Sequence, residues 1–176
     1  VDNISAEIIS EKTGKDISNN LEILAGESNI FTESKQTRLM QNQGDALIAN
    51  IKVNKQNDTQ INPGDRFELN LSEALILEDR IISGVNNAKY DIVGEGGTIA
   101  KAEVSQDKKM ITYTFTDYVK NHEIDSLDLT IPVYFDRTEI ITNMHGITGS
   151  LSIGTSEFKE KISGVDYSDS NVTYKN

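Results

Sequence analysis

Residues 99–119 read IAKAEVSQDKKMITYTFTDYV and predict a β-hairpin with arms at 99–104 and 110–119. Apolar and polar residues alternate in both arms, which is the period of a strand that buries one face. The polar residues 106–109 are the expected hairpin loop. In the second arm an apolar row lies on one face and a threonine row on the other: Ile111, Tyr113 and Phe115 against Thr112, Thr114 and Thr116.

The sequence before this hairpin predicts two further strands around a turn. Residues 49–53 and 66–71 alternate in the same way. Between them lies Asn62-Pro63-Gly64-Asp65, where proline sets one φ angle and glycine supplies an unusual one. We therefore expect a pair of strands joined by a Pro-Gly turn.

After the hairpin, residues 127–135 and 147–153 also alternate. Pro132 has no N–H for a sheet ladder, so its strand should lie at a sheet edge or carry a bulge. Two segments allow alternatives: residues 73–83 form a short helix or a bent strand, and residues 17–24 form a helix or a turn before a first strand.

Many short strands with regular turns, and no helices alternating with them, predict an all-β fold of the immunoglobulin-like β-sandwich class, with a possible short N-terminal helix. We expect an N-terminal segment at 1–43, the Ig-like domain at 44–163 and a polar linker toward a following domain at 164–176. The chain begins with Val and shows neither a leader nor an anchor, so we expect a piece of a longer, exported protein.

The composition argues against several function classes. The net charge is -11, which disfavours nucleic acid as a partner. No run approaches the ~20 apolar residues of a membrane helix, and the chain has no cysteine. The only histidines, His122 and His145, lack the spacing of metal ligands. We therefore expect no catalytic residue, no metal and no cofactor, and we interpret the chain as a binding domain and not as an enzyme.

The threonine row suggests a way of binding. Small hydroxylated side chains leave a shallow surface over which another chain can lie, and an added strand gains backbone hydrogen bonds. We expect the strand 110–119 to lie beside a sandwich edge and to accept a foreign strand.

The sequence also resembles a known family. Residues 112–120, TYTFTDYVK, resemble the T-Y-T-F-T-D-Y-V-D motif of Gram-positive surface adhesins of the MSCRAMM type, which include clumping factors and serine-aspartate repeat proteins. Lys120 departs from the final Asp of that motif. Residues 61–67 resemble the family's I-x-P-G-D-x-F turn, residues 131–137 its L-P-I-F-I-D-R strand, and residues 164–175 its junction into the next domain.

The resemblance implies an adhesin domain that binds a host plasma or matrix protein in a cleft shared with an adjacent Ig-like domain of the same chain. The host protein would be fibrinogen, collagen or fibronectin, with fibrinogen or collagen favoured, and a strand of the neighbour would latch the complex. The strand that receives the latch would be Thr112, Tyr113, Thr114, Phe115, Thr116, Asp117 and Tyr118, and the linker would line the cleft with Asp166, Tyr167 and Tyr174.

The same resemblance implies an extracellular, cell-wall-anchored protein that serves in virulence, with the anchor outside this fragment. It leaves open a Lys–Asn isopeptide cross-link, for which the sequence singles out no lysine. The alternative is a structural stalk or spacer domain that presents a neighbour and binds no ligand itself.

Overall fold

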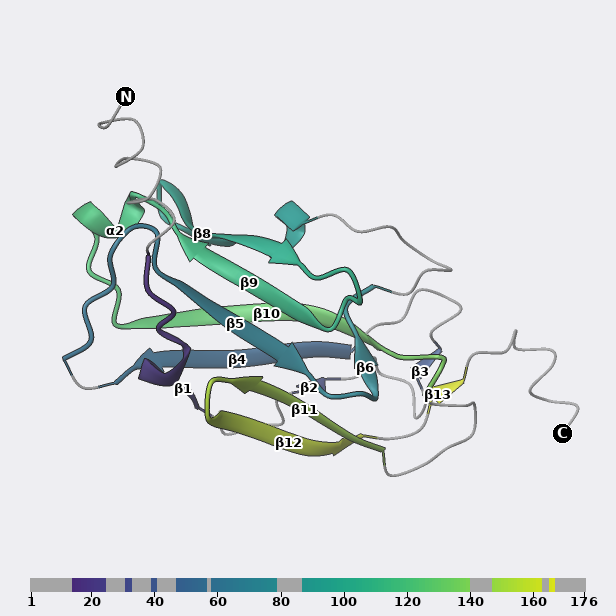
Figure 1. Cartoon of the computed structure of the whole chain (residues 1–176). Helices are drawn as coiled ribbons and strands as arrows, with labels where there is room; N and C mark the ends of the chain where they lie inside the picture. The colour runs from purple at the N-terminus through teal and green to yellow at the C-terminus, as the bar shows by residue number, and fades with distance from the viewer. Residues whose placement is uncertain are drawn as a thin grey trace, which may run out of the picture.

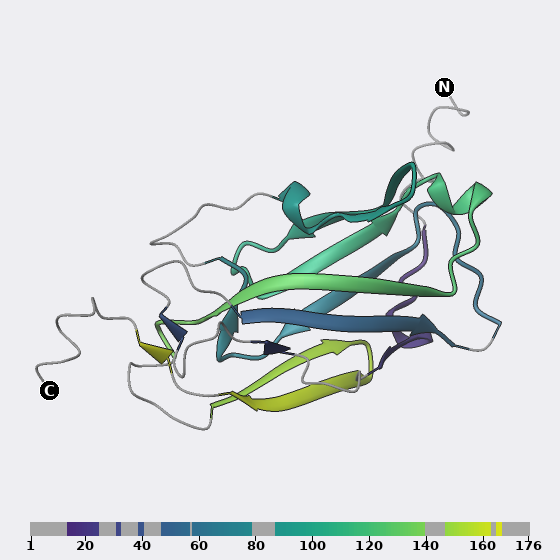
Figure 2. The same ribbon diagram turned by 180° about the vertical axis from the view of Figure 1, so that it is seen from behind.

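The computed structural model describes residues 14–24, 31–32, 39–40, 47–56, 58–78, 87–139, 147–162 and 165–166. Most of these residues lie in β-strands or in the turns that join them (Figure 1). Two sheets enclose one apolar core, which is the architecture of a β-sandwich (Figure 2). The predicted all-β sandwich is confirmed.

The larger sheet has six described strands in the order β12–β11–β5–β9–β8–β7, and all neighbours are antiparallel. The predicted hairpin is its β8–β9 pair, in which Ala102 lies opposite Tyr113. The bounds are β5 Arg66–Leu71, β7 Ile92–Gly94, β8 Gly97–Val104, β9 Met110–Phe115, β11 Ile147–Ile153 and β12 Ser156–Ile162.

The smaller sheet has the order β1–β4–β10–β6, and β2 also pairs with β4. Its strands are β1 Leu21–Leu24, β2 Phe31–Thr32, β4 Leu47–Lys55, β6 Leu75–Ile76 and β10 Ser126–Phe135. A separate parallel pair joins β3 Leu39–Met40 to β13 Val165–Asp166, so two residues of the expected linker lie in a short strand.

Three short helical turns complete the described fold: η1 Ser18–Asn20, η3 Asn87–Tyr90 and α2 Tyr118–Asn121. None of the helices in the described ranges has the length and apolar character needed to cross a membrane.

The core is built from the inward faces of both sheets. Tyr113, Phe67 and Phe135 are the largest of its fully buried side chains. The ring of Phe67 stacks on Tyr113 with centroids 4.9 Å apart and tilts against Phe115 at 5.7 Å. Burying a side chain of this size contributes about 1.5–3 kcal/mol, so this aromatic group anchors β5 and β9 against each other.

The Pro-Gly turn has the predicted form, but it does not close a hairpin. The N–H of Asp65 donates to the carbonyl of Asn62 at 3.0 Å, and Gly64 takes a φ of 89°. However, β4 and β5 lie in different sheets. The turn is tied to β9, because the N–H of Gly64 donates to the carbonyl of Phe115 at 2.9 Å. The two predicted strands and the turn between them are therefore present, and the turn carries the chain from one sheet to the other.

The strand predicted at 110–119 ends at Phe115. The Thr116 hydroxyl donates to the carbonyl of Thr98 at 2.5 Å and accepts a hydrogen bond from the N–H of Tyr118 at 3.1 Å. A threonine side chain that binds nearby backbone in this way competes with the sheet ladder. The chain turns at Asp117 and enters α2, so the prediction of a strand through residues 116–119 was wrong.

The structure also decides the first alternative left by the sequence and part of the second. Residues 18–20 form the turn η1 and lead into β1, whose Leu21 and Ile23 are buried. In the segment 73–83 the structure describes residues 73–78, of which Leu75–Ile76 form the short strand β6, while Ile81 and Ile82 lie outside the described residues.

Candidate functional site

The strand β9, which carries the threonine row, lies inside its sheet. It pairs with β5 on one side and with β8 on the other. Thr114, for example, lies opposite both Arg66 and Lys101. Since both backbone edges of β9 are paired, the expectation that this strand has a free edge for a foreign strand was wrong.

The side chains of the motif divide between core and surface. Tyr113 and Phe115 are buried, while Thr114 is exposed and Thr112 is half-buried. The Tyr113 hydroxyl is buried with no hydrogen-bond partner among the described residues. Burial raises the pKa of this phenol, with a smaller contribution from the Asp91 carboxylate, so it stays protonated.

The end of the motif forms a small polar cap. Asp117 is exposed, and the Tyr118 hydroxyl donates to the carbonyl of Glu95 at 3.0 Å. The ring of Tyr118 stacks on His122 with centroids 3.8 Å apart. The cap joins α2 to the β7–β8 turn and so fixes the segment that leads into β10.

The linker residues assigned to a cleft are only partly described. Asp166 lies in β13, opposite Met40 of β3, and its side chain is outside the description. Tyr167 and Tyr174 lie outside the described residues. The cleft therefore stays a prediction.

A free strand edge does occur in the described fold, on β10. This strand pairs with β4 from Ser126 to Val133, but on its other side β6 covers only Tyr134 and Phe135. We call the uncovered side of residues 126–132 the open edge. It contains Pro132, which agrees with the expectation of a sheet edge for this stretch among the described residues, although β10 as a whole stands between β4 and β6 in the strand order.

One hydrogen bond fixes which backbone groups point out of the open edge. The N–H of Lys55 donates to the carbonyl of Asp125 at 3.1 Å, in register with the β4–β10 ladder. Because hydrogen-bonded pairs alternate in an antiparallel ladder, the odd-numbered residues of β10 bond to β4. The even-numbered residues direct their N–H and C=O groups outward: Ser126, Asp128, Thr130 and, with its carbonyl alone, Pro132.

The open edge can therefore offer three donors and four acceptors to another extended chain. The side chains of Ser126, Asp128 and Thr130 are exposed, and those of Leu127, Leu129 and Ile131 are buried. A strand added here would continue the ladder of the smaller sheet. Pro132 withholds one donor and so limits such pairing near the end of the edge.

The arrangement is suited to backbone pairing. No three His, Cys, Asp or Glu side chains within the described ranges gather where they could hold a metal ion. In the sequence, Pro132 was the residue that indicated the open edge. The threonine row of β9 pointed to a different strand.

Comparison with known proteins agrees with this fold. The family model for the bacterial Ig domain matches residues 40–145. The chain is 31% identical over 113 residues to serine-aspartate repeat-containing protein E of Staphylococcus aureus, which covers 64% of this chain and 10% of that protein. It is 27% identical over 136 residues to serine-aspartate repeat-containing protein D of the same species, which covers 74% of this chain and 9% of that protein.

Solved structures show the same fold at low sequence identity. The serine-rich repeat adhesion glycoprotein of Streptococcus agalactiae superposes with a TM-score of 0.65 at 21% identity, over 89% of this chain and 49% of that chain. The collagen adhesin of S. aureus superposes with a TM-score of 0.50 at 13% identity, over 89% of this chain and 46% of that chain.

The chain spans about a tenth of the length of the curated relatives and about half of the solved adhesin chains. The resemblance is thus confirmed for the serine-aspartate repeat proteins, while the role of the T-Y-T-F motif stays a prediction. With its two-sheet sandwich and a family model that matches more than half of its length, this chain belongs to the bacterial Ig domain family.

Proposed function

We propose that this chain is an Ig-like binding domain of a Gram-positive surface adhesin, and that it grips its partner by strand addition at the open edge of β10. The observation that carries the proposal is the row of outward backbone groups at Ser126, Asp128 and Thr130, which no described strand pairs. The similarity to serine-aspartate repeat proteins and to solved adhesins supports the placement on a cell surface.

The proposal assigns the added strand to an adjacent Ig-like domain of the same protein. A host protein held between the two domains would be locked in place once that strand pairs with β10. Fibrinogen and collagen are the favoured host proteins and fibronectin is the third. One solved structure with this fold is a collagen adhesin, which supports collagen as a candidate.

In this proposal the T-Y-T-F strand keeps an indirect role. Tyr113 and Phe115 lie in the core and Phe67 packs on both rings, so they stabilise the sandwich that presents β10. Tyr118 donates to the β7–β8 turn through its hydroxyl and stacks on His122, which lies between α2 and β10, so it holds the segment before β10 in position.

The proposal is tested on the parent surface protein with two variants of one residue. Thr130→Pro removes an outward N–H, whereas Thr130→Ala keeps it and removes only the side chain. Binding to immobilised fibrinogen, collagen and fibronectin is measured for both. We expect one host protein to bind, and Thr130→Pro to weaken binding roughly fivefold or more, because one backbone hydrogen bond contributes about 1 kcal/mol.

Thr130→Ala should bind within about twofold of the unchanged protein, since it keeps every outward backbone group. Equal weakening by both variants would show that the side chain and not the open edge makes the contact. Failure of all three host proteins to bind would favour the alternative, a spacer domain that presents its neighbour.

A further inference from the structure

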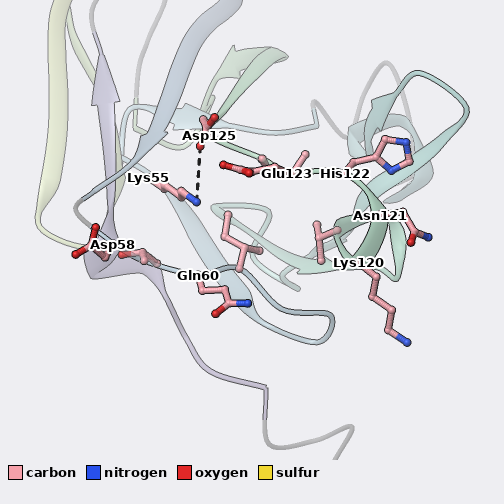
Figure 3. Close-up of a pocket in the computed structure, with 12 residues that line it drawn as sticks. Lys55, Asp58, Gln60, Lys120, Asn121, His122, Glu123 and Asp125 are labelled. Carbon is pink, nitrogen blue, oxygen red and sulfur yellow. Dashed lines mark ion pairs between the residues drawn. The ribbon is translucent and has the colours of Figure 1, made fainter.

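A pocket of about 680 Å³ opens at one end of the sandwich (Figure 3). Its walls are residues 58–61, from the β4–β5 connection, and residues 119–125, which lead from α2 into β10, with Lys55 beside them. This is the end marked by α2 in Figure 1, opposite to the end that holds β3 and β13. The pocket shares none of its lining residues with the open edge of β10.

Hydrogen bonds hold both walls in place. The backbone bond from Lys55 to Asp125, 3.1 Å long, ties the end of β4 to the wall formed by residues 119–125. Thr59 donates to the carbonyl of Gln56 through its N–H at 3.2 Å and through its hydroxyl at 2.7 Å. The N–H of Lys120 donates to the carbonyl of Asp117 at 3.0 Å. A ligand would therefore enter a pocket whose backbone is already ordered, which lowers the entropy lost on binding.

The lining combines an apolar base with polar groups of every kind. Ile61, Val119 and Ile124 are partly buried and pack against the core. The polar groups comprise carboxylates, ammonium groups, amides and one imidazole: Asp58, Glu123 and Asp125; Lys55 and Lys120; Gln60 and Asn121; and His122. Two lysines against three carboxylates leave little net charge, so the lining favours neither a phosphate group nor a free cation.

Lys55 has hydrogen-bonding capacity that its described ion pair does not use. Its side chain is only 20% exposed, and its described ion-pair partner is Asp125 at 3.7 Å, whose own side chain is 75% exposed. An ammonium group carries three N–H donors, and one distant, exposed carboxylate satisfies few of them. The remaining donors are available to acceptor groups of a ligand in the pocket (Figure 3).

We infer that this pocket binds a neutral sugar of a glycan chain. Each sugar hydroxyl both donates and accepts, and so matches adjacent carboxylates, amides and an ammonium group. The C–H face of a sugar ring can lie on the apolar base formed by Ile61, Val119 and Ile124. The volume falls within the range of about 300–1,000 Å³ that is usual for small-molecule sites.

The test uses amide chemical shifts of the isotope-labelled chain, titrated to millimolar levels with the neutral disaccharides lactose, cellobiose and N,N′-diacetylchitobiose. We expect at least one disaccharide to shift the amides of residues 58–61 and 119–125. Lys55→Met should weaken that binding roughly tenfold, which corresponds to about 1.4 kcal/mol. Lys101→Ala, which removes an exposed lysine of β8 outside the pocket, should leave it unchanged.

Asn121→Ala is the second variant, because it leaves the Lys55–Asp125 pair in place if Lys55→Met disturbs the fold; it should also weaken binding. The inference is overturned if no disaccharide shifts these amides, or if Asn121→Ala binds as tightly as the unchanged chain. Shifts produced at these residues by glucuronate or glucosamine, and by none of the neutral sugars, would overturn it as well.

Discussion

The ammonium group of Lys109 lies 2.7 Å from Oδ2 of Asp136 and joins the two sheets of the sandwich. Lys109 precedes β9 in the larger sheet, and Asp136 follows β10 in the smaller one. The same ammonium group donates to the carbonyls of Glu73 and Leu75, beside β6. The two side chains are 22% and 11% exposed, so solvent screens their interaction only in part.

Removing the charge of Asp136 should destabilise the fold. Asp136→Asn keeps an oxygen for the N–H of Thr138 but leaves the Lys109 ammonium without its carboxylate. We expect the free energy of unfolding, measured with urea, to fall by about 2–3 kcal/mol, since hydrogen bonds to charged groups are worth about 1.5–3 kcal/mol. The control is Glu157→Gln in the exposed Lys159–Glu157 pair, for which we expect about 0.5 kcal/mol or less. Equal losses in both variants would contradict a special role for Lys109 and Asp136.

The same carboxylate should make stability depend on acid pH. Burial acts to raise the pKa of Asp136, but hydrogen bonds from Lys109 and Thr138 outweigh it and lower the pKa below its usual 3.8. A group whose pKa is lower in the folded chain adds stability above its unfolded pKa and loses it as the pH falls through the folded pKa. The difference in unfolding free energy between the unchanged chain and Asp136→Asn should thus be largest at neutral pH and should shrink below pH 3.8. Urea midpoints across this range measure it, and a constant difference would contradict the prediction.

The open edge predicts an alternation in amide hydrogen exchange along β10. The N–H groups of Leu127, Leu129 and Ile131 point to β4 and should exchange slowly, while those of Ser126, Asp128 and Thr130 point outward and should exchange several orders of magnitude faster. Exchange rates from NMR spectra of the chain alone measure this. Slow exchange at all six residues would mean that another segment covers the edge.

Sequence patterns predicted most strands and the β8–β9 hairpin, but not which strands that are distant in sequence lie side by side. Alternation states which residues share a face, and so it located β4, β5, β9 and β10. Alternation does not indicate which strand is the hydrogen-bonded neighbour, because a strand has the same period at an edge or in the middle of a sheet. For this reason the sequence could not tell that β4 and β5 lie in different sheets.

The prediction of the candidate site from sequence failed for the same reason, because sequence patterns do not give the neighbours of a strand. The threonine row of β9 suggested a free edge because of its side chains, whereas a free edge is a property of the neighbouring backbone. Pro132 carried the relevant signal, because it lacks the N–H that an inner strand needs. The end of β9 was missed because the Thr116 hydroxyl takes over hydrogen bonding that the ladder would otherwise provide.

Two buried tyrosines should respond in opposite ways to loss of their hydroxyls. The Tyr90 hydroxyl lies 2.9 Å from the carbonyl of Leu77 and 3.1 Å from Oε1 of the fully buried Glu78, whereas the Tyr113 hydroxyl has no described partner. Burial raises the pKa of both phenols, so both are neutral at ordinary pH. Tyr90→Phe should therefore lower the free energy of unfolding by about 1–3 kcal/mol, because it removes a donor from a buried carboxylate.

Tyr113→Phe keeps the ring that stacks on Phe67 and removes only the unpaired hydroxyl. Leaving a buried polar group unpaired costs about 1–3 kcal/mol, so this variant should be as stable as the unchanged chain or more stable by about 1 kcal/mol. Urea unfolding of the two variants side by side makes the comparison. A loss at Tyr113 as large as that at Tyr90 would show that its hydroxyl is hydrogen-bonded in solution, for example to a buried water molecule.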